Sequence, residues 1–306
     1  MIFPLWVQGL GERPWPYVTT IIILINCAVF FATHAQIERE SREMARVELP
    51  MLLIAAAHPE VQPPADAKPL VDSFAQDNKE LWDGIRSGKQ PPINEWDREM
   101  RDWGDTQASD EMASLADRLK RDQSDSVLQK YAFYPYKPTV MGFLTANFLH
   151  GGWLHLIFNM WFLWLAGAMM ESAWGPMIYT GFYLLAGATG LIAHATTYPH
   201  SVVPVLGASG AIAGLIGGFL VRFPHVKIDL VVIYFRIIRV AWPAVIVLPV
   251  WILLQLLWGS LAQTSGGVAY WAHVGGFVFG MAMAIALRLM GLERTIAETG
   301  EPELAR

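Results

Sequence analysis

Four long stretches of the chain contain no Asp, Glu, Lys or Arg, and this pattern predicts its main elements. They are residues 14–37, 138–170, 172–221 and 240–287. A helix needs about 20 apolar residues to span a bilayer, so the first two stretches hold one helix each and the others hold two. Polar breaks at 196–204 and 262–267 divide the longer stretches. We therefore predict spanning helices at about 17–33, 147–169, 175–195, 208–222, 241–262 and 268–288.

Residues 34–138 have a different pattern, with 20 acidic and 14 basic side chains. Residues 58–69 resemble an extended linker, and apolar residues recur at helical spacing in Trp96, Met100 and Trp103 and again in Met112, Leu115 and Leu119. The predicted fold class is an all-α membrane protein, a six-helix bundle with a helical extramembrane insert of roughly 100 residues between helices one and two. The insert is either a solvated structural element or a substrate-recruiting one.

These patterns predict four parts: an N-terminal segment with the first span (1–33), the insert (34–138), a membrane core (139–290) and a tail (291–306). Lys and Arg gather in the 223–240 loop, at its edges and in the tail, whereas the breaks at 196–204 and 262–267 have none. Basic loops stay in the cytoplasm, so both termini should be cytoplasmic, in a membrane of the bacterial cytoplasmic type. The first 20 residues lack the order of a cleavable signal peptide, so the first span should be retained.

Composition narrows the class of protein further. Hydrophobic residues make up 54% of the 306 residues and charged residues 16%, against about 25% charged in soluble domains. A net charge of −5 offers no electrostatic case for binding nucleic acid. The single cysteine, Cys27, cannot form an intrachain disulfide. The chain suggests no metal or cofactor site, and its oligomeric state is left open.

Polar side chains inside predicted spans are costly in lipid and therefore mark candidate sites. His150 lies at the mouth of the second span. His155 and Asn159 are four residues apart, so they share one helix face. An interhelical hydrogen bond to a neighbouring span is the structural alternative for this pair.

The fourth and sixth spans each combine a polar residue with glycines. Ser209 begins the fourth span, between Gly207, which can supply a tight turn, and Gly210, which leaves the backbone open. Glycines then recur every four residues, at 210, 214 and 218 in the fourth span and at 276 and 280 in the sixth. Such seams let helices approach closely, and His273 lies one turn before the second seam.

Topology brings these groups together. Spans two, four and six all enter from the non-cytoplasmic side, so Ser209 and His273 should be hydrogen-bond neighbours at one shallow depth. A serine hydroxyl becomes a strong nucleophile when an adjacent base takes its proton, and histidine suits that task near neutral pH. Asn159, His155 and the Ser209 backbone N–H could stabilise an oxyanion. Because residues 240–287 contain no acid, a Ser–His dyad is predicted.

Four motifs resemble the rhomboid family of intramembrane serine proteases: HGGWLHLIFN (150–159), GAMMESAWG (167–175), GASG (207–210) and AHVGGFVFG (272–280). The resemblance implies that Ser209 is the nucleophile and His273 the base, that His155 and Asn159 line the oxyanion hole, and that His150 lies nearby. It also implies that Glu171 is a structural carboxylate that ties loop backbone together. The expected partners are transmembrane protein substrates and the lipid bilayer.

Two positions depart from the family pattern. The stretch before the second span, FYPYKPTVMGFLTANFLH, lacks the Trp-Arg pair that many members carry. The fourth residue after the proposed nucleophile is Ala213 instead of an aromatic, so the ring of His273 must be positioned by other neighbours.

Two other classes compete with the protease. A catalytically inactive rhomboid-like protein that binds transmembrane helices would be expected to lack the serine or the histidine, and both are present. A transporter would be expected to pair its histidines with intramembrane acids, which these spans lack.

Overall fold

The structure is a computed structural model and describes residues 2–233, 237–261 and 268–294. The chain is mostly helical, at 71%. The predicted break at 262–267 and residues 295–306 of the predicted tail lie outside the described residues. The longer helices are α1 (Tyr17–Ala57), α5 (Asp105–Asp125), α9 (Ala168–Thr197), α10 (Ser209–Arg222), α11 (Ala244–Leu261) and α12 (Tyr270–Leu289).

Shorter elements connect and extend these helices. They are α2 (Lys68–Asp77), α3 (Lys79–Arg86), α4 (Glu95–Met100), α6 (Val127–Tyr131), α7 (Val140–Thr145), α8 (Trp153–Phe162), the 3-10 turns Leu10–Glu12 and Ala146–Phe148, and a π-helical turn Leu163–Gly167. The strands are β1 (Ile2–Val7), β2 (Lys227–Ile233) and β3 (Ile237–Pro243).

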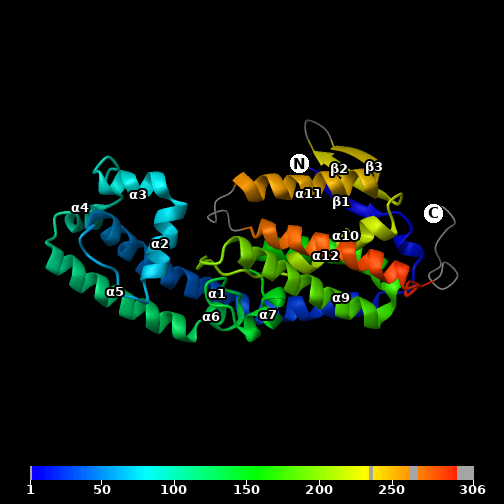
Figure 1. Cartoon of the computed structure of the whole chain (residues 1–306), viewed down its shortest axis with the longest axis horizontal. Coiled ribbons are helices and arrows are strands. Elements are labelled where there is room, and N and C mark those ends of the chain that lie inside the picture. Colours follow the sequence, from blue (N-terminus) through cyan, green and yellow to red (C-terminus); the bar gives the residue numbers. More distant parts are fainter. Residues whose placement is uncertain (1, 234–236, 262–267, 295–306) are drawn as a thin grey trace.

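Helix α10 lies at the centre of the apolar bundle and is buried over Gly210–Phe219. Helices α9 and α12 pack closely against it, and the bundle lies at the opposite end of the molecule from α2–α5 (Figure 1). A helix that is apolar on all sides is typical of a bundle interior. Helix α10 has this character over Gly210–Val221, and its one charged residue, Arg222, is its last.

Three helical stretches are long and apolar enough to cross a membrane: Tyr17–Ala57, Trp153–Thr197 and Tyr270–Leu289. The second is divided at Gly175, whose φ of 75° interrupts the helix just before Pro176, close to the predicted division between spans two and three. Ser209–Arg222 and Ala244–Trp258 are shorter apolar helices. Each predicted span therefore overlaps an apolar helix, and three stretches have spanning length. The helix of the second predicted span begins only at Trp153, not near 147, because residues 149–152 are non-helical.

The first helix is much longer than predicted, because it continues from the predicted end near residue 33 to Ala57. The charged residues that begin at Glu38 limit the part of this segment that can lie in lipid, but they do not prevent the helix from continuing. In this extension Arg42 donates to Glu38 at 2.9 Å and Gln36 donates to Glu40 at 2.7 Å, which are spacings that support helix. The last turns then bury Met51–Ala56.

Helices α2–α5 pack around the end of α1 and form a hydrophobic core of their own. Its fully buried members include Met51, Ile54, Met100 and Met112. Of the residues that predicted helices here, Met100, Met112, Leu115 and Leu119 are buried, whereas Trp96 and Trp103 are half-buried. The chain at 58–67 is non-helical, as expected for the linker.

The all-α prediction is wrong in one respect, because the chain also contains a three-stranded antiparallel sheet in the order β1-β2-β3. Leu230 pairs with Pro4 and with Val240. At the start of β2, Lys227 and Asp229 are exposed and Ile228 and Leu230 are buried, which is the two-residue period of a strand. The fifth helix consequently begins at Ala244, not near 241.

Candidate active site

The loop before α10 is fixed by backbone bonds to distant segments. Phe133 and Val205 exchange backbone hydrogen bonds of 3.0 and 2.8 Å, and the Gly207 N–H donates to the Ala146 carbonyl at 2.8 Å. Gly207 has a φ of 116°, a conformation that L side chains rarely adopt. These constraints set the position of Ser209, the first residue of α10.

Helices α10 and α12 approach closely along the predicted glycine seam. A Cβ added at Gly276 would overlap the carbonyl oxygen of Gly210, and one added at Gly280 would overlap that of Gly214. Because these obstacles are backbone atoms, no side chain can rotate away to make room. The seam therefore depends on glycine and brings the starts of the two helices side by side.

Ser209 and His273 form a hydrogen bond across this interface. The Oγ of Ser209 lies 2.9 Å from the Nε2 of His273, although the residues are 64 positions apart. Both side chains are half-buried. The distance falls within the range that a base needs to take a proton from a nucleophile.

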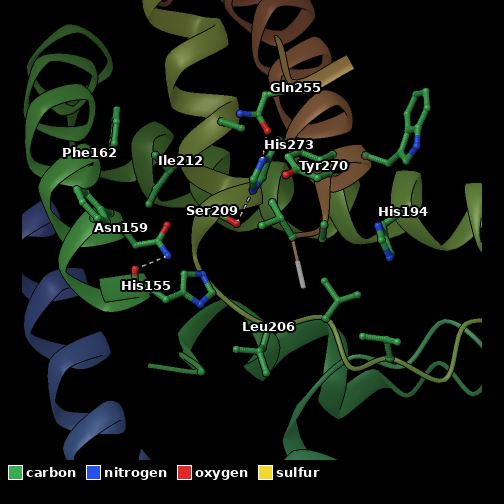
Figure 2. A pocket seen from close by; sticks show the side chains of 18 of the residues that line it. His155, Asn159, Phe162, His194, Leu206, Ser209, Ile212, Gln255, Tyr270 and His273 are labelled. Carbon is green, nitrogen blue, oxygen red and sulfur yellow. Dashed lines mark hydrogen bonds between the residues drawn. The ribbon is translucent and has the colours of Figure 1, made fainter. Parts of the chain in front are cut away.

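The other ring nitrogen of His273 has a partner that we did not predict. Its Nδ1 lies 2.8 Å from the Oε1 of Gln255 on α11, and the labelled side chains converge in Figure 2. Trp251 stacks on the same ring at 6.3 Å with planes 28° apart, so this residue supplies an aromatic neighbour that Ala213 does not. The sequence feature that could have identified Gln255 as a site residue is its amide side chain in a largely apolar predicted span.

His155 and Asn159 lie together on one side of Ser209 (Figure 2). Their spacing predicted the shared helix face. The Asn159 Nδ2 donates to the His155 carbonyl at 2.9 Å, which uses one of its two N–H donors. The His155 ring lies against Gly207, where an added Cβ would be 2.6 Å from the His155 Nε2. Gly207 thus leaves room for the imidazole beside the serine.

His150 is fully buried next to this group. Its ring meets that of His155 edge-on, with centroids 5.1 Å apart. His150 therefore contacts the ring of His155.

Glu171 lies on α9 and binds the beginning of α1. Its carboxylate accepts from the backbone N–H groups of Val18 and Thr19 at 2.9 and 2.8 Å, and from the Thr19 hydroxyl at 2.8 Å. The carboxylate does bind backbone groups, as expected, but these groups belong to the first turn of α1 and not to a loop. A negative charge there also complements the helix dipole.

Four of the candidate residues, Ser209, His273, His155 and Asn159, line a cavity of about 640 Å³, whereas His150 and Glu171 are not part of its lining. Its lining includes Ser209, His273, His155, Asn159 and Gln255, together with apolar side chains from α8, α10 and α11. His194 and Tyr270 also line it (Figure 2). Such a cavity combines an apolar wall with a few converging polar groups, as ligand sites commonly do. Among the described residues, no group of three or more His, Cys, Asp or Glu could hold a metal ion.

The Rhomboid domain family model matches residues 137–289, half of the chain. The chain belongs to the rhomboid family. The motifs at 150–159, 167–175, 207–210 and 272–280 all lie inside the matched region of this rhomboid protein.

Relatives of this rhomboid protein include named proteases. It is 32% identical over 163 residues to "Rhomboid protein 1, mitochondrial" of Saccharomyces cerevisiae, covering 50% of this chain and 44% of that protein. It is 36% identical over 150 residues to "Rhomboid protease GluP" of Bacillus subtilis, covering 48% and 26%. It is 31% identical over 144 residues to "Rhomboid-like protease 5" of Toxoplasma gondii, covering 45% and 15%.

The chain spans less than half the length of these relatives. Rhomboid proteins are typically intramembrane proteases, although some members are inactive. The family and the apolar helices make this chain an integral membrane protein.

Proposed function

We propose that this protein is an intramembrane serine endopeptidase that cleaves single-span membrane proteins near the outer edge of the membrane. The observation that carries the proposal is the 2.9 Å bond between the Ser209 Oγ and the His273 Nε2 in a cavity that also holds two candidate oxyanion donors. An inactive helix-binding protein has no need of this bond.

The reaction follows from the positions of these atoms. The Ser209 Oγ attacks the scissile carbonyl carbon while its proton passes to the His273 Nε2. The imidazolium then returns that proton to the leaving amine as the peptide bond breaks. Water, deprotonated by the same nitrogen, hydrolyses the acyl-enzyme and releases Ser209.

The oxyanion is stabilised by donors on the Asn159 side of the serine. The second N–H of the Asn159 amide is one donor and the His155 ring is another. The Ser209 backbone N–H is a third, because the first N–H groups of a helix have no intrahelical partner. Donors that the fold holds in position before reaction need little reorganisation as charge develops.

Replacing Asn159 with alanine should slow cleavage by about 10²–10³-fold without abolishing it, because one preorganised oxyanion donor is lost. His155→Ala should behave similarly, unless the two donors substitute for one another. Turnover of a reconstituted substrate measures the effect. An unchanged kcat for Asn159→Ala in both detergent and lipid would remove this residue from the oxyanion hole.

We assign six spans, made by α1, by the two parts of the stretch divided at Gly175, and by α10, α11 and α12. We keep the domain boundaries at 33, 138 and 290 with this assignment.

Several basic residues lie at the end of the bundle where the helix is interrupted at Gly175. Arg13 donates to the Ser172 hydroxyl at 3.2 Å, and the Arg294 backbone N–H donates to the Ala173 carbonyl at 2.9 Å. Arg222 lies 3.5 Å from Glu293 at the same end.

This basic end of the bundle is assigned to the cytoplasm by the preference of Lys and Arg for that side. The starts of α8, α10 and α12, with Ser209 and His273, then face the outside, and residues 34–138 form the extramembrane insert there. The membrane would be of the bacterial cytoplasmic type. Relatives in mitochondria leave an organelle membrane as the alternative.

Substrate reaches the serine from the lipid. A second cavity of about 450 Å³ is lined mainly by apolar side chains of α8, α10, α11 and the sheet. It shares Phe158, Phe162, Ile216 and Trp251 with the first cavity. A transmembrane segment could therefore pass between α8 and α11 towards Ser209.

The cut should fall at the outer edge of substrate spans that contain helix-weakening Gly or Pro, with a small residue at the cleaved bond, a preference taken from the rhomboid resemblance. A continuous helix hides its carbonyls in hydrogen bonds that are costly to break in lipid. We would co-reconstitute a panel of labelled single-span substrates, with the same permissive segment at the outer or the inner edge, and map products by mass spectrometry. Ser209→Ala is the matched control.

Cleavage confined to the inner edge would contradict the assigned orientation. Efficient cutting of an uninterrupted leucine helix would contradict the unwinding requirement. Binding of substrates without any cleavage, equal in wild type and Ser209→Ala, would favour the inactive helix-binding protein.

A further inference from the structure

Gln255 is an unusual residue for its helix. Helix α11 has the sequence AVIVLPVWILLQLLWGSL, in which Gln255 and Ser260 are the residues with an amide or hydroxyl side chain. The Ser260 hydroxyl donates to the Leu256 carbonyl of its own helix at 2.8 Å. The Gln255 amide instead reaches another helix, where its Oε1 lies 2.8 Å from the His273 Nδ1. Burying an amide in an apolar helix is costly without such a partner.

The atom of Gln255 that faces Nδ1 bears on the tautomer of His273, because the donor and acceptor roles of the ring nitrogens depend on that tautomer. The Gln255 Oε1 only accepts, so with the amide in this orientation the proton lies on Nδ1. A neutral imidazole has one protonated nitrogen and one with a free lone pair, so its Nε2 is left as the acceptor. That nitrogen lies 2.9 Å from the Ser209 Oγ. This is the tautomer that can take the serine proton.

We infer that Gln255 is a positioning residue that holds His273 as the general base, in the place where serine proteases with a triad carry an acid. The inference rests on the proposed protease function and adds to it. In a triad the acid fixes the imidazole's tautomer and orientation and stabilises the imidazolium. A neutral amide supplies the first two effects and only part of the third, and it avoids burying a carboxylate in the membrane.

Trp251 completes the support from the same helix. It precedes Gln255 by four residues, so both side chains lie on one face of α11. Trp251 stacks on the face of the His273 ring and Gln255 holds its Nδ1 edge. The orientation of the base therefore depends on α11 remaining seated against α12, although His273 itself belongs to α12.

The test compares Gln255→Leu, Gln255→Glu and wild type, with Ser260→Ala as a control on the same helix. Gln255→Leu should lower kcat by about 10–100-fold, the range found when the hydrogen-bond partner that orients a metal-ligating histidine is removed, with KM changed less than about twofold. Gln255→Glu keeps an acceptor at Nδ1 and should recover most of this loss. Ser260→Ala should match wild type.

The pH profile separates positioning from mere packing. A carboxylate at position 255 favours the imidazolium, so the acid limb of the kcat profile should move to higher pH in Gln255→Glu. A purely structural role would leave the limb in place. Wild-type kcat in Gln255→Leu, or equal losses and profiles in the Leu and Glu variants, would overturn the inference.

A measurement on the unmodified protein avoids any problem of folding in the variants. Nitrogen-15 NMR of histidine-labelled protein at neutral pH should show His273 with a protonated Nδ1 and an unprotonated Nε2, assigned by comparison with His273→Ala. The opposite tautomer would overturn the inference. If wild type itself cleaves no substrate, the proposed function fails; if wild type cleaves and only the Gln255 results fail, the protease proposal stands without this residue.

Discussion

Ser209→Ala and His273→Ala should each lower cleavage by about 10⁴-fold or more, to the limit of detection, because each change removes one half of the unit that creates the nucleophile. The two atoms already lie 2.9 Å apart across α10 and α12. The double variant should be no worse than either single one, since residues that act as a unit lose their contribution together. Turnover of a reconstituted single-span substrate, with thermal unfolding measured in parallel, provides the numbers.

Neither substitution should unfold the protein, because each removes atoms from the lining of an existing cavity. A multiplicative loss in the double variant would show that the two side chains act independently. Substantial proteolysis in either single variant would eliminate the dyad.

Gly276→Ala should also lower activity strongly, although this residue does not line the cavity. The added methyl would overlap the carbonyl oxygen of Gly210 and force apart the two helices that carry Ser209 and His273. Overpacking a tight interface costs about 1–3 kcal/mol and occasionally more, and an ångström of displacement at a catalytic pair can cost about 10²-fold in rate. We therefore expect a lower unfolding temperature together with at least that loss of activity. Valine at Gly276 or Gly214 should be worse.

Gly181→Ala is the matched control for this experiment. Gly181 lies on α9, and an added Cβ there would have no atom within 4 Å. Alanine has the higher helix propensity by about 1 kcal/mol, so this variant should be as stable and as active as wild type. Normal activity and normal stability in Gly276→Ala would refute the packing account of the seam.

The positions of the apolar helices could be predicted from the sequence because long charge-free windows bound them on both sides. The predicted fourth span, 208–222, coincides with the helix Ser209–Arg222, and the predicted sixth span, 268–288, coincides with the helix Tyr270–Leu289. The pairing of Ser209 with His273 could be predicted for the same reason. Once helix direction is known, residues at matching helix starts lie at matching depth.

Other features were missed because a local pattern does not contain them. The extension of α1 to Ala57 depends on charged pairs and on a core made with α3 and α5. The sheet requires β1 to meet β2 across a long separation in the sequence, since Ile2 pairs with Val232. Gln255 is a polar residue inside a predicted span, and by the rule applied to His155 and Asn159 it could have been a candidate site residue. Its role, however, depends on its distance to the His273 ring, and that distance is set by the packing of α11 against α12.

The most direct test of the central claim, that His273 makes Ser209 a nucleophile, is covalent labelling by a fluorophosphonate. The protein would be treated in lipid and analysed by mass spectrometry, because this reagent traps a serine oxygen that an adjacent base has activated. We predict one adduct per chain, on Ser209 of wild type, and almost none in His273→Ala. Labelling of a different residue, or equal labelling of Ser209 with and without His273, would contradict the account.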